Sequence, residues 1–198
     1  MTRGRGARLG AGALVVAALA VGAAITTHTP DTDARERPFV RAGVVGQPVN
    51  ARTFDATVVS VRGAARVTGG AKSARVRDTA GVWVVVRVRL AARDKPTTVD
   101  HAVVRDARGR STLATPRVVQ PLIGNAVVQP GIPVEGDVVF EVPRDAAAAG
   151  LTIGLADALD PRMDAVAEVP LPIDRATVDR WLAQPVPMVI ADAAVVAP

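Results

Sequence analysis

The segment Gly81-Val-Trp-Val-Val-Val-Arg-Val-Arg-Leu90 decides the fold of this chain. Valine fills the even positions up to Leu90, whereas the odd positions begin with Trp83 and end with Arg87 and Arg89. Because successive side chains of a β-strand point to opposite faces, this alternation predicts a strand with one face in a core. The other face is expected to be covered at its start and to meet water at its end. We interpret the segment as the central strand of a β-sandwich.

Further strands are expected at regular spacing along the chain. Apolar runs separated by turn residues about every 8–12 positions are typical of all-β sandwiches rather than of folds that alternate strands and helices. The sequence therefore predicts an all-β fold, an immunoglobulin-like β-sandwich of about seven or eight strands. The expected strands are Ala51–Val61, Val82–Ala92, Thr98–Arg105, Arg110–Ala114, Val134–Val142, Leu151–Leu155 and Ala165–Ile173.

Local features add detail to this pattern. The apolar parity changes between Val58 and Val59, which indicates a β-bulge or a strand that changes sheets. Residues 67–81 are predicted to form a loop or edge segment followed by a turn. Asp106-Ala-Arg-Gly109 is predicted to be a hairpin turn, because glycine tolerates a positive φ. Pro170 marks the last strand as an edge strand, since proline has no N–H to donate to a neighbour.

The composition limits both the core and the chemistry. Hydrophobic residues make up 49% of the chain but aromatic residues only 3%, so the core must be built from Val, Ala, Leu and Ile. There is no Cys, which excludes disulfides, thiolate metal sites and a cysteine nucleophile. The net charge is +5, of which Arg3, Arg5 and Arg8 supply +3. The interleaved basic and aromatic residues of a nucleic-acid surface are absent, and we predict no nucleic-acid partner.

An uncharged run of 17 residues, Leu9–Ile25, follows the three N-terminal arginines. With Thr26 and Thr27 it reaches the ~20 residues that a transmembrane helix needs. A cleaved signal peptide is the alternative, with Ala18-Leu19-Ala20 as its small-x-small cleavage site. Because arginines ahead of such a segment stay in the cytoplasm, both alternatives place the rest of the chain outside the cell membrane. The preferred prediction is an uncleaved, single-pass anchor that contacts the membrane through residues 9–27.

The C-terminal end differs from the strand region. Asp174 is predicted to cap a short helix that carries Val178, Trp181 and Leu182 on one face. The segment after it, residues 184–198, is extended and apolar, and either packs on the domain or docks on a partner. The predicted organisation is a basic cytoplasmic N-terminus (1–8), a transmembrane anchor or uncleaved signal (9–27), a tether (28–42), the β-sandwich (43–173), and the short helix with the apolar tail (174–198).

Three blocks carry a resemblance to a known family. They are Val45-Gly-Gln-Pro-Val49, the hairpin Val103-Val-Arg-Asp-Ala-Arg-Gly-Arg110, and Gln129-Pro-Gly-Ile-Pro-Val-Glu-Gly-Asp-Val-Val-Phe-Glu-Val-Pro143, which leads from a Pro-Gly turn to a Val-x-Phe-x-Val-Pro strand. Through them, residues 43–173 resemble the telokin-like, immunoglobulin-type domains of Gram-positive bacteria. The resemblance implies an exported or membrane-anchored domain and supplies no catalytic residues. Ala91-Ala-Arg-Asp-Lys-Pro96 replaces the Asn-Thr-Gly-like loop of that family.

The polar residues do not form a recognisable catalytic set. The two histidines are His28, in the tether, and His101, in a strand. The three serines, Ser60, Ser73 and Ser111, lack a Gly-x-Ser-x-Gly context. We therefore predict that the chain is not an enzyme and binds no metal or cofactor, with His101 as the last candidate residue if it were a hydrolase.

Two groups of charged residues are further candidates. Three closely spaced aspartates could surround a hard cation, although turn formation is preferred because the EF-hand spacing is missing. Arginines of the central strand and of the hairpin would form a basic patch if these two elements were neighbours, and a solvated sheet face is the preferred alternative. The aspartates are Asp157, Asp160 and Asp164, and the arginines are Arg87, Arg89, Arg105, Arg108 and Arg110.

The candidate partner contacts are Trp83, Arg87, Arg89 and Trp181. Trp83 either contacts a partner or is covered by the C-terminal helix beside Trp181, and the second alternative is preferred. The predicted function is a membrane-anchored, extracytoplasmic, immunoglobulin-like binding or scaffolding module with a protein partner outside the membrane. The alternatives are an accessory subunit of a membrane transporter or secretion complex, and a secreted protein after signal cleavage.

Overall fold

The computed structural model describes residues 3–28, 36–69, 75–118 and 122–197, without the side chains of residues 3–13, 15 and 28. The chain divides into two compact units, residues 1–37 and 38–198. In the first unit, helix α1 spans Arg3–His28 and contains the predicted apolar run. Among the residues described, no helix is both long enough and apolar enough to cross a membrane. The transmembrane helix predicted over residues 9–27 therefore has no support in the structure.

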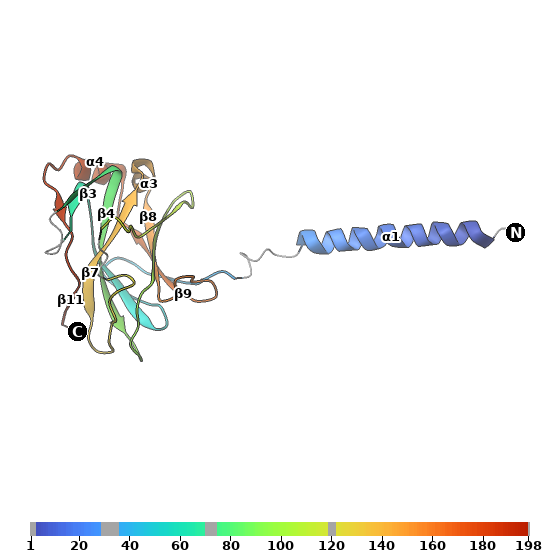
Figure 1. Ribbon diagram of the computed structural model, residues 1–198, viewed down its shortest axis with the longest axis horizontal. Helices are drawn as coiled ribbons and strands as arrows, with labels where there is room; N and C mark the ends of the chain where they lie inside the picture. The colour runs from blue at the N-terminus through green and yellow to red at the C-terminus, as the bar shows by residue number, and fades with distance from the viewer. Residues whose placement is uncertain (1–2, 29–35, 70–74, 119–121, 198) are drawn as a thin grey trace. The chain divides into compact units, whose positions relative to one another are not determined.

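Residues 38–198 form a two-sheet β-sandwich with few short helices (Figure 1), which confirms the all-β prediction. The five-stranded sheet contains, in spatial order, β1 (Phe39–Ala42), β9 (Ala165–Leu171), β8 (Leu151–Ala156), β5 (His101–Asp106) and β6 (Ser111–Leu113). The six-stranded sheet contains β10 (Met188–Val189), β3 (Phe54–Thr68), β4 (Val76–Ala92), β7 (Val134–Val142) and β11 (Ala194–Val195), with β2 (Pro48–Asn50) paired to β3. The strands that were not predicted are β1 at the end of the tether, β2 ahead of the first predicted strand, and β10 and β11 in the C-terminal tail.

The predicted central strand is the centre of the six-stranded sheet. Strand β4 pairs with β3 on one side and with β7 on the other, both antiparallel. Its even-numbered side chains from Val82 to Leu90 are fully buried in the core between the two sheets. The facing sheet contributes residues such as Val104, Ile153 and Leu155 to the same core. Burying an aliphatic side chain of this size stabilises a fold by about 1.5–3 kcal/mol, so packing of this kind can hold a domain without disulfides.

The hairpin of β3 and β4 is longer than predicted. The described parts of residues 67–81, which were expected to be a loop or edge segment followed by a turn, continue the ladder, with Val67 opposite Arg77 and Asp78 opposite Arg66. The prediction was wrong because Val67 is buried under a distant segment of the chain, which a local pattern cannot reveal. The predicted β-bulge is confirmed, since the register shifts between Val58 and Ser60.

The turn of the β5–β6 hairpin is confirmed in detail. Gly109 has a φ of +81°, which glycine adopts without steric cost. One carboxylate oxygen of Asp106 accepts the backbone N–H groups of Arg108, at 2.9 Å, and of Arg110, at 2.8 Å. Burial favours the neutral form of Asp106, but the hydrogen bonds from Arg110 and from the turn outweigh it and lower its pKa. The Asp106–Gly109 segment therefore forms the hairpin turn that its Asp-x-x-Gly pattern predicts.

The last predicted strand, β9, is not at the edge of its sheet. It lies between β8 and β1, because the end of the predicted tether adds β1 in parallel alongside Ala165–Glu168. Pro170 lies beyond these paired residues, which is where a missing N–H is tolerated. The edge prediction was therefore wrong for the strand as a whole, and the domain begins a few residues earlier than the predicted boundary at residue 43.

Helices α3 (Arg144–Ala148) and α4 (Arg175–Leu182) lie at one end of the sandwich (Figure 1). The predicted cap of α4 is confirmed, since the Asp174 carboxylate accepts the N–H of Thr177 at 2.8 Å. This hydrogen bond holds the pKa of Asp174 below its ordinary value. The tail after α4 packs on its own domain, with β10 parallel to β3 and β11 antiparallel to β7. Of the two alternatives left open by the sequence, the structure selects packing in cis.

Candidate functional site

The outer face of β4 carries three of the four predicted contact residues. Trp83, Val85, Arg87 and Arg89 share this face because they have the same parity along the strand. Trp83 is 0% exposed, whereas the Arg87 side chain is 22% exposed and that of Arg89 is 42% exposed. The face is therefore covered at the start of the central strand and open at its end, as the sequence predicted.

Trp83 lies in a second, smaller core on the outer face. It is buried with Val85 of the same strand, and the cover comes from the tail and from the segment that precedes β7. The indole N–H donates to the carbonyl of Arg77 at 3.1 Å, and the guanidinium of Arg117 lies over the ring at 5.3 Å from its centroid. The other buried members of this core are Val67, Val118, Val139 and Ile190. Trp83 presents no surface to a partner, so its assignment as a contact residue is corrected.

Trp181 lies on the opposite side of the sheet from Trp83. Its ring packs on Gly63, where any Cβ would collide with it, and Gly63 is paired with Val84, which faces the main core. Helix α4 therefore closes the end of the sandwich rather than its outer face. The prediction that Trp83 is covered is right, but the cover is the tail, and Trp181 is not beside it.

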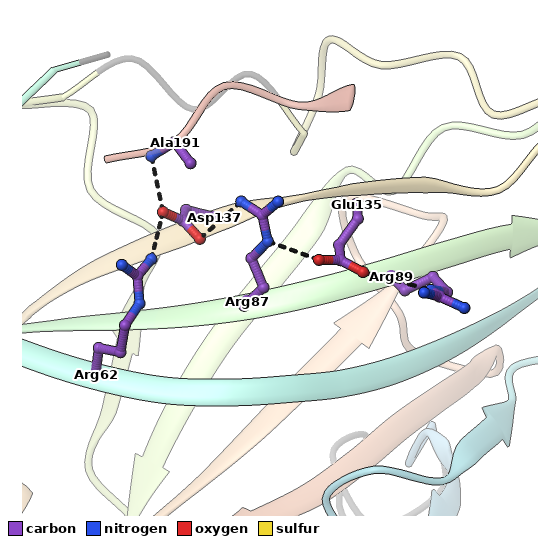
Figure 2. Close-up of polar contacts among 6 residues, drawn as sticks. All are labelled: Arg62, Arg87, Arg89, Glu135, Asp137 and Ala191. Atoms are coloured by element: carbon purple, nitrogen blue, oxygen red, sulfur yellow. Dashed lines mark hydrogen bonds and ion pairs between the residues drawn. The ribbon is translucent and has the colours of Figure 1, made fainter. Parts of the chain in front are cut away.

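A buried carboxylate, Asp137, lies next to the covered core. The residue is 0% exposed, and its carboxylate accepts Arg62 Nη2 at 2.6 Å and the backbone N–H of Ala191, in the tail, at 2.8 Å. Arg87 Nη1 approaches its second oxygen at 3.4 Å. Figure 2 shows the carboxylate between the two guanidinium groups, with Ala191 reaching it from the tail. These contacts compensate for removing a charge from water, which is unfavourable unless the charge is paired.

Glu135 continues this row toward the open end. Its carboxylate accepts Arg87 Nε at 2.8 Å and Arg89 Nε at 3.4 Å (Figure 2). The hydrogen bond from Arg87 lowers the pKa of Glu135, and the same bond raises the pKa of Arg87. Arg87 is therefore committed to two carboxylates, whereas Arg89 holds one of them at the longer distance. Of the predicted contact residues on β4, Arg89 is the one best placed to meet a partner.

An open groove of about 500 Å³ follows at this end of the outer face. Arg89 and Asp55 lie in its wall, and the half-exposed Val59, which is the bulged residue of β3, supplies apolar surface. The other lining residues are Gly46, Pro48, Thr57, Ala91 and Pro133. A concave surface with an apolar lining and few charged groups is the usual form of a binding site.

The candidate basic patch is not formed. Strand β5 and the hairpin turn belong to the five-stranded sheet, so the hairpin does not lie beside β4. Each hairpin arginine is paired with a carboxylate: Arg105 with Glu168 at 3.1 Å, Arg108 with Asp145 at 3.8 Å and Arg110 with Asp106 at 2.6 Å. The condition for the patch is therefore not met, and carboxylates of β5, α3 and β9 neutralise the hairpin arginines.

The aspartates with cation-like spacing are engaged separately. Asp157 accepts the Thr53 hydroxyl at 2.7 Å, Asp160 pairs with Arg162 at 2.6 Å, and Asp164 pairs with Arg52 at 3.0 Å. In the described part of the chain, no group of three or more His, Cys, Asp or Glu residues is arranged to hold a metal. Turn and loop interactions therefore explain these residues, as the sequence favoured.

His101 has a structural contact. Its Nδ1 lies 3.1 Å from the carbonyl oxygen of Leu159, which can only accept, so Nδ1 carries the proton. Within the described residues, no hydrogen bond joins His101 to Ser60 or Ser111. Ser73 and the His28 side chain lie outside the described residues. An activated serine needs a base within hydrogen-bonding distance, and His101 is not hydrogen-bonded to either serine that the structure describes.

Comparisons with known proteins assign no family to the chain. No family model matches it, and no curated protein matches it in sequence. Its fold is similar to that of an uncharacterized β-sandwich protein from Clostridium difficile 630, at 9% identity and a TM-score of 0.46, over 72% of this chain and 99% of the other. It is also similar to the yjhA protein from Bacillus subtilis, at 18% identity and a TM-score of 0.42, over 64% and 97%. The comparisons report similarity to these two bacterial proteins and do not assign the telokin-like family.

Proposed function

We propose that the chain is a membrane-anchored, extracytoplasmic binding or scaffolding module of immunoglobulin type, without catalytic activity. The observation that supports this best is the open groove on the outer face of the six-stranded sheet. Most of that face is occupied by the chain itself, through the tail and through ion pairs within the sheet. The groove around Arg89 and Val59 is left open, and these two side chains are 42% and 41% exposed.

The chemistry of the groove suits a protein segment with an acidic group next to apolar side chains. Arg89 offers a guanidinium that Glu135 holds only at 3.4 Å, so a partner carboxylate can compete for it. Val59 and the prolines of the lining supply apolar contact. Arginine beside apolar surface is typical of interface centres, where a few well-packed residues carry most of the binding free energy.

The proposed anchor rests on the sequence of α1. The run Leu9–Ile25 carries no charge over 17 residues and follows three arginines. The uncharged run with Thr26 and Thr27, residues 9–27 of helix α1, is about 28 Å long at 1.5 Å per residue, close to the ~30 Å hydrocarbon core of a bilayer. The arginines would stay in the cytoplasm and the β-sandwich would be exported.

Topology is tested with an alkaline phosphatase fused after Val40. The fusion should be active, because this reporter folds only outside the cytoplasm, and a cytoplasmic reporter fused at the same residue should be inactive. The opposite pair of activities would contradict the proposal. The mass of the full chain purified from membranes then separates an uncleaved anchor from a signal cleaved after Ala20. If cleavage is found, the secreted alternative replaces the anchored one.

Binding through the groove is tested by purifying the full chain from membranes with Val59→Asp or Arg89→Glu. Both variants should lose a protein that co-purifies with the wild type. Arg105→Glu is the matched control, because Arg105 is a similarly exposed, ion-paired arginine on the other sheet, and it should retain the protein. Equal loss with all three variants, or with none, would count against the groove as the contact surface.

An accessory subunit of a membrane transporter or secretion complex is the second candidate function from the sequence. Its proposed contact was the C-terminal tail, which lies on its own domain. The groove is therefore the better-supported contact in either case.

A further inference from the structure

The C-terminal tail, residues 185–197, crosses the outer face of the six-stranded sheet from one edge to the other. We call this segment the strap. It begins at the β3 edge, where Met188 lies opposite Val67, and it ends at the β7 edge, where Val195 lies opposite Val134. Between these edges, Ile190 fills the small core around Trp83 and is 2% exposed. The strap is thus bound as an extended peptide.

The face beneath the strap is shaped to receive a peptide main chain. Gly136 of β7, which faces the main core with its partner Val88, lies beside Ala193 at the β7 edge, and a Cβ there would lie 3.2 Å from the Cα of Ala193. The buried Asp137 carboxylate accepts the N–H of Ala191 at 2.8 Å. The carbonyls of Thr68 and Pro133 accept the N–H groups of Ile190, at 2.9 Å, and of Val196, at 3.0 Å. A peptide that adds to a sheet is typically held by main-chain hydrogen bonds and by a pocket for one of its side chains, here the core that Ile190 fills.

We propose that this face also receives the strap of a second copy of the chain, so that two copies are linked by exchange of their C-terminal strands. The molecule itself specifies the occupant: the surface already fits this sequence, and every copy carries both the surface and the strap. Exchange of an identical element replaces each contact made within a chain by the same contact between chains, so it changes little in contact energy. The proposal concerns a different surface from the groove and stands whether or not the groove binds a partner.

Two features make the strap exchangeable. The ladders at its two ends are short, with two paired residues at β10 and two at β11, so release at either edge breaks few hydrogen bonds. The hinge after α4 contains Pro185 and Pro187, which cannot continue a helix and favour an extended path away from the domain. The chain's own strap competes for this face at an effective concentration of about 1 mM or more. The strap of a second copy can therefore replace it only where the copies are held close together.

The absence of Cys allows a direct test in the full chain. The N–H of Val196 donates to the carbonyl of Pro133, so the adjacent pair Val195–Val134 is the non-hydrogen-bonded kind, with Cα atoms about 4.5 Å apart. That distance suits a disulfide. Two copies with tags of different size are therefore expressed in the same membranes, one with Val195→Cys and the other with Val134→Cys. After mild oxidation, the expected result is a mixed dimer that reducing agent dissolves.

Two control pairs define the background. In the first, Val195→Cys is paired with Ser111→Cys, which lies at the exposed edge of the other sheet. In the second, the strap that carries Val195→Cys also carries Ile190→Asp, so it cannot fill the core around Trp83. The mixed dimer should exceed both controls several-fold.

A single chain with both Val134→Cys and Val195→Cys completes the test. This chain should form an internal bridge, which verifies the cis contact under the same conditions. An internal bridge without a mixed dimer above background would overturn exchange between copies. Failure of the internal bridge would overturn the proposal as well, since the seat of the strap would then be wrong.

Discussion

The two halves of the outer face of β4 share one strand, one parity and one sheet, yet they differ in burial and in polarity. Around Trp83 the face is dry and covered by the strap, whereas around Arg89 it is open and lined by polar and apolar groups together. The change occurs over six residues, and the ion pairs of Arg87 mark it. A sheet face of this kind is therefore divided by whatever distant segment lies on it, not by the strand alone.

The division has an energetic consequence. The covered half owes its stability to removing Trp83 and the aliphatic side chains around it from water. The open half has only partly exposed ion pairs, which contribute little to stability in water. Substitutions in the covered half should therefore change the free energy of unfolding, while substitutions in the open half should change binding.

The largest effect is expected for Trp83→Ala. It leaves a cavity under the strap and removes the ring from beneath Arg117, so we expect a loss of about 3–5 kcal/mol in the free energy of unfolding. Arg89→Ala, on the same face of the same strand, is the matched control and should change it by no more than about 0.5 kcal/mol. Urea unfolding of both variants measures the difference. Similar values for the two would remove the distinction between the halves.

The second effect is expected at the boundary, for Asp137→Ala. It leaves Arg62, Arg87 and the N–H of Ala191 without their shared acceptor. Because both arginines are partly exposed, the expected loss is about 2–4 kcal/mol, somewhat below that for two fully buried partners. Asp137→Asn keeps one acceptor oxygen and should recover part of this loss. If Asp137→Ala unfolds at the same urea concentration as the wild type, the carboxylate does not hold the strap.

The covered half also shows what the sequence could and could not predict. The alternation in Gly81–Leu90 was enough to assign the core face and the covered start of the outer face, because both follow from strand geometry. It could not identify the cover, since Ile190 is more than a hundred residues from Trp83 in the chain. Strand order decides such contacts, and a local period contains no information about it.

The ion pairs at the boundary were missed for a related reason. Glu135 and Asp137 alternate with apolar residues in a predicted strand, as Arg87 and Arg89 do in theirs. Only the register of β7 against β4 shows that Arg87 lies opposite Asp137, and Arg89 opposite Glu135. Opposite-charge patterns of equal spacing in two predicted strands were the one available signal, since such pairs favour a particular register.

The third effect is expected in the strap, for Ile190→Ala, and its size is limited by the free energy with which the strap docks on the sheet. Ile190→Ala removes the side chain that fills the core around Trp83, a loss of about 2–5 kcal/mol in a fixed core. Here the strap can detach instead, so the free energy of docking sets the upper limit, and we expect about 1–3 kcal/mol. In a Trp181→Phe background, fluorescence reports on Trp83 alone and should shift to longer wavelength. Unchanged emission would show that other segments cover the indole.

A smaller effect, and one that depends on pH, is expected for Glu135→Gln. The pKa of Glu135 is lowered in the folded state, so its stabilising contribution is present above the unfolded pKa of about 4.3 and is lost as the pH falls through the folded pKa. The raised pKa of Arg87 affects only strongly alkaline solution. The variant should therefore be less stable than the wild type at pH 7, by about 1 kcal/mol, and the difference should shrink as the pH falls below about 4.3 and through the lowered folded pKa. A difference that is constant with pH would mean that charge is not its cause.

The smallest effect on stability is expected in the open half, for Val59→Asp. Val59 is the bulged residue of β3 and 41% exposed, so its replacement should change the free energy of unfolding by no more than about 0.5 kcal/mol. A bulge frees a side chain from the ladder and often redirects it toward a functional surface. Placed in the groove beside Arg89, the new carboxylate would engage the guanidinium that a partner needs. Loss of partner binding with unchanged urea unfolding would assign this half to recognition, whereas a loss of stability comparable to that of Trp83→Ala would show that the open half, too, belongs to the core.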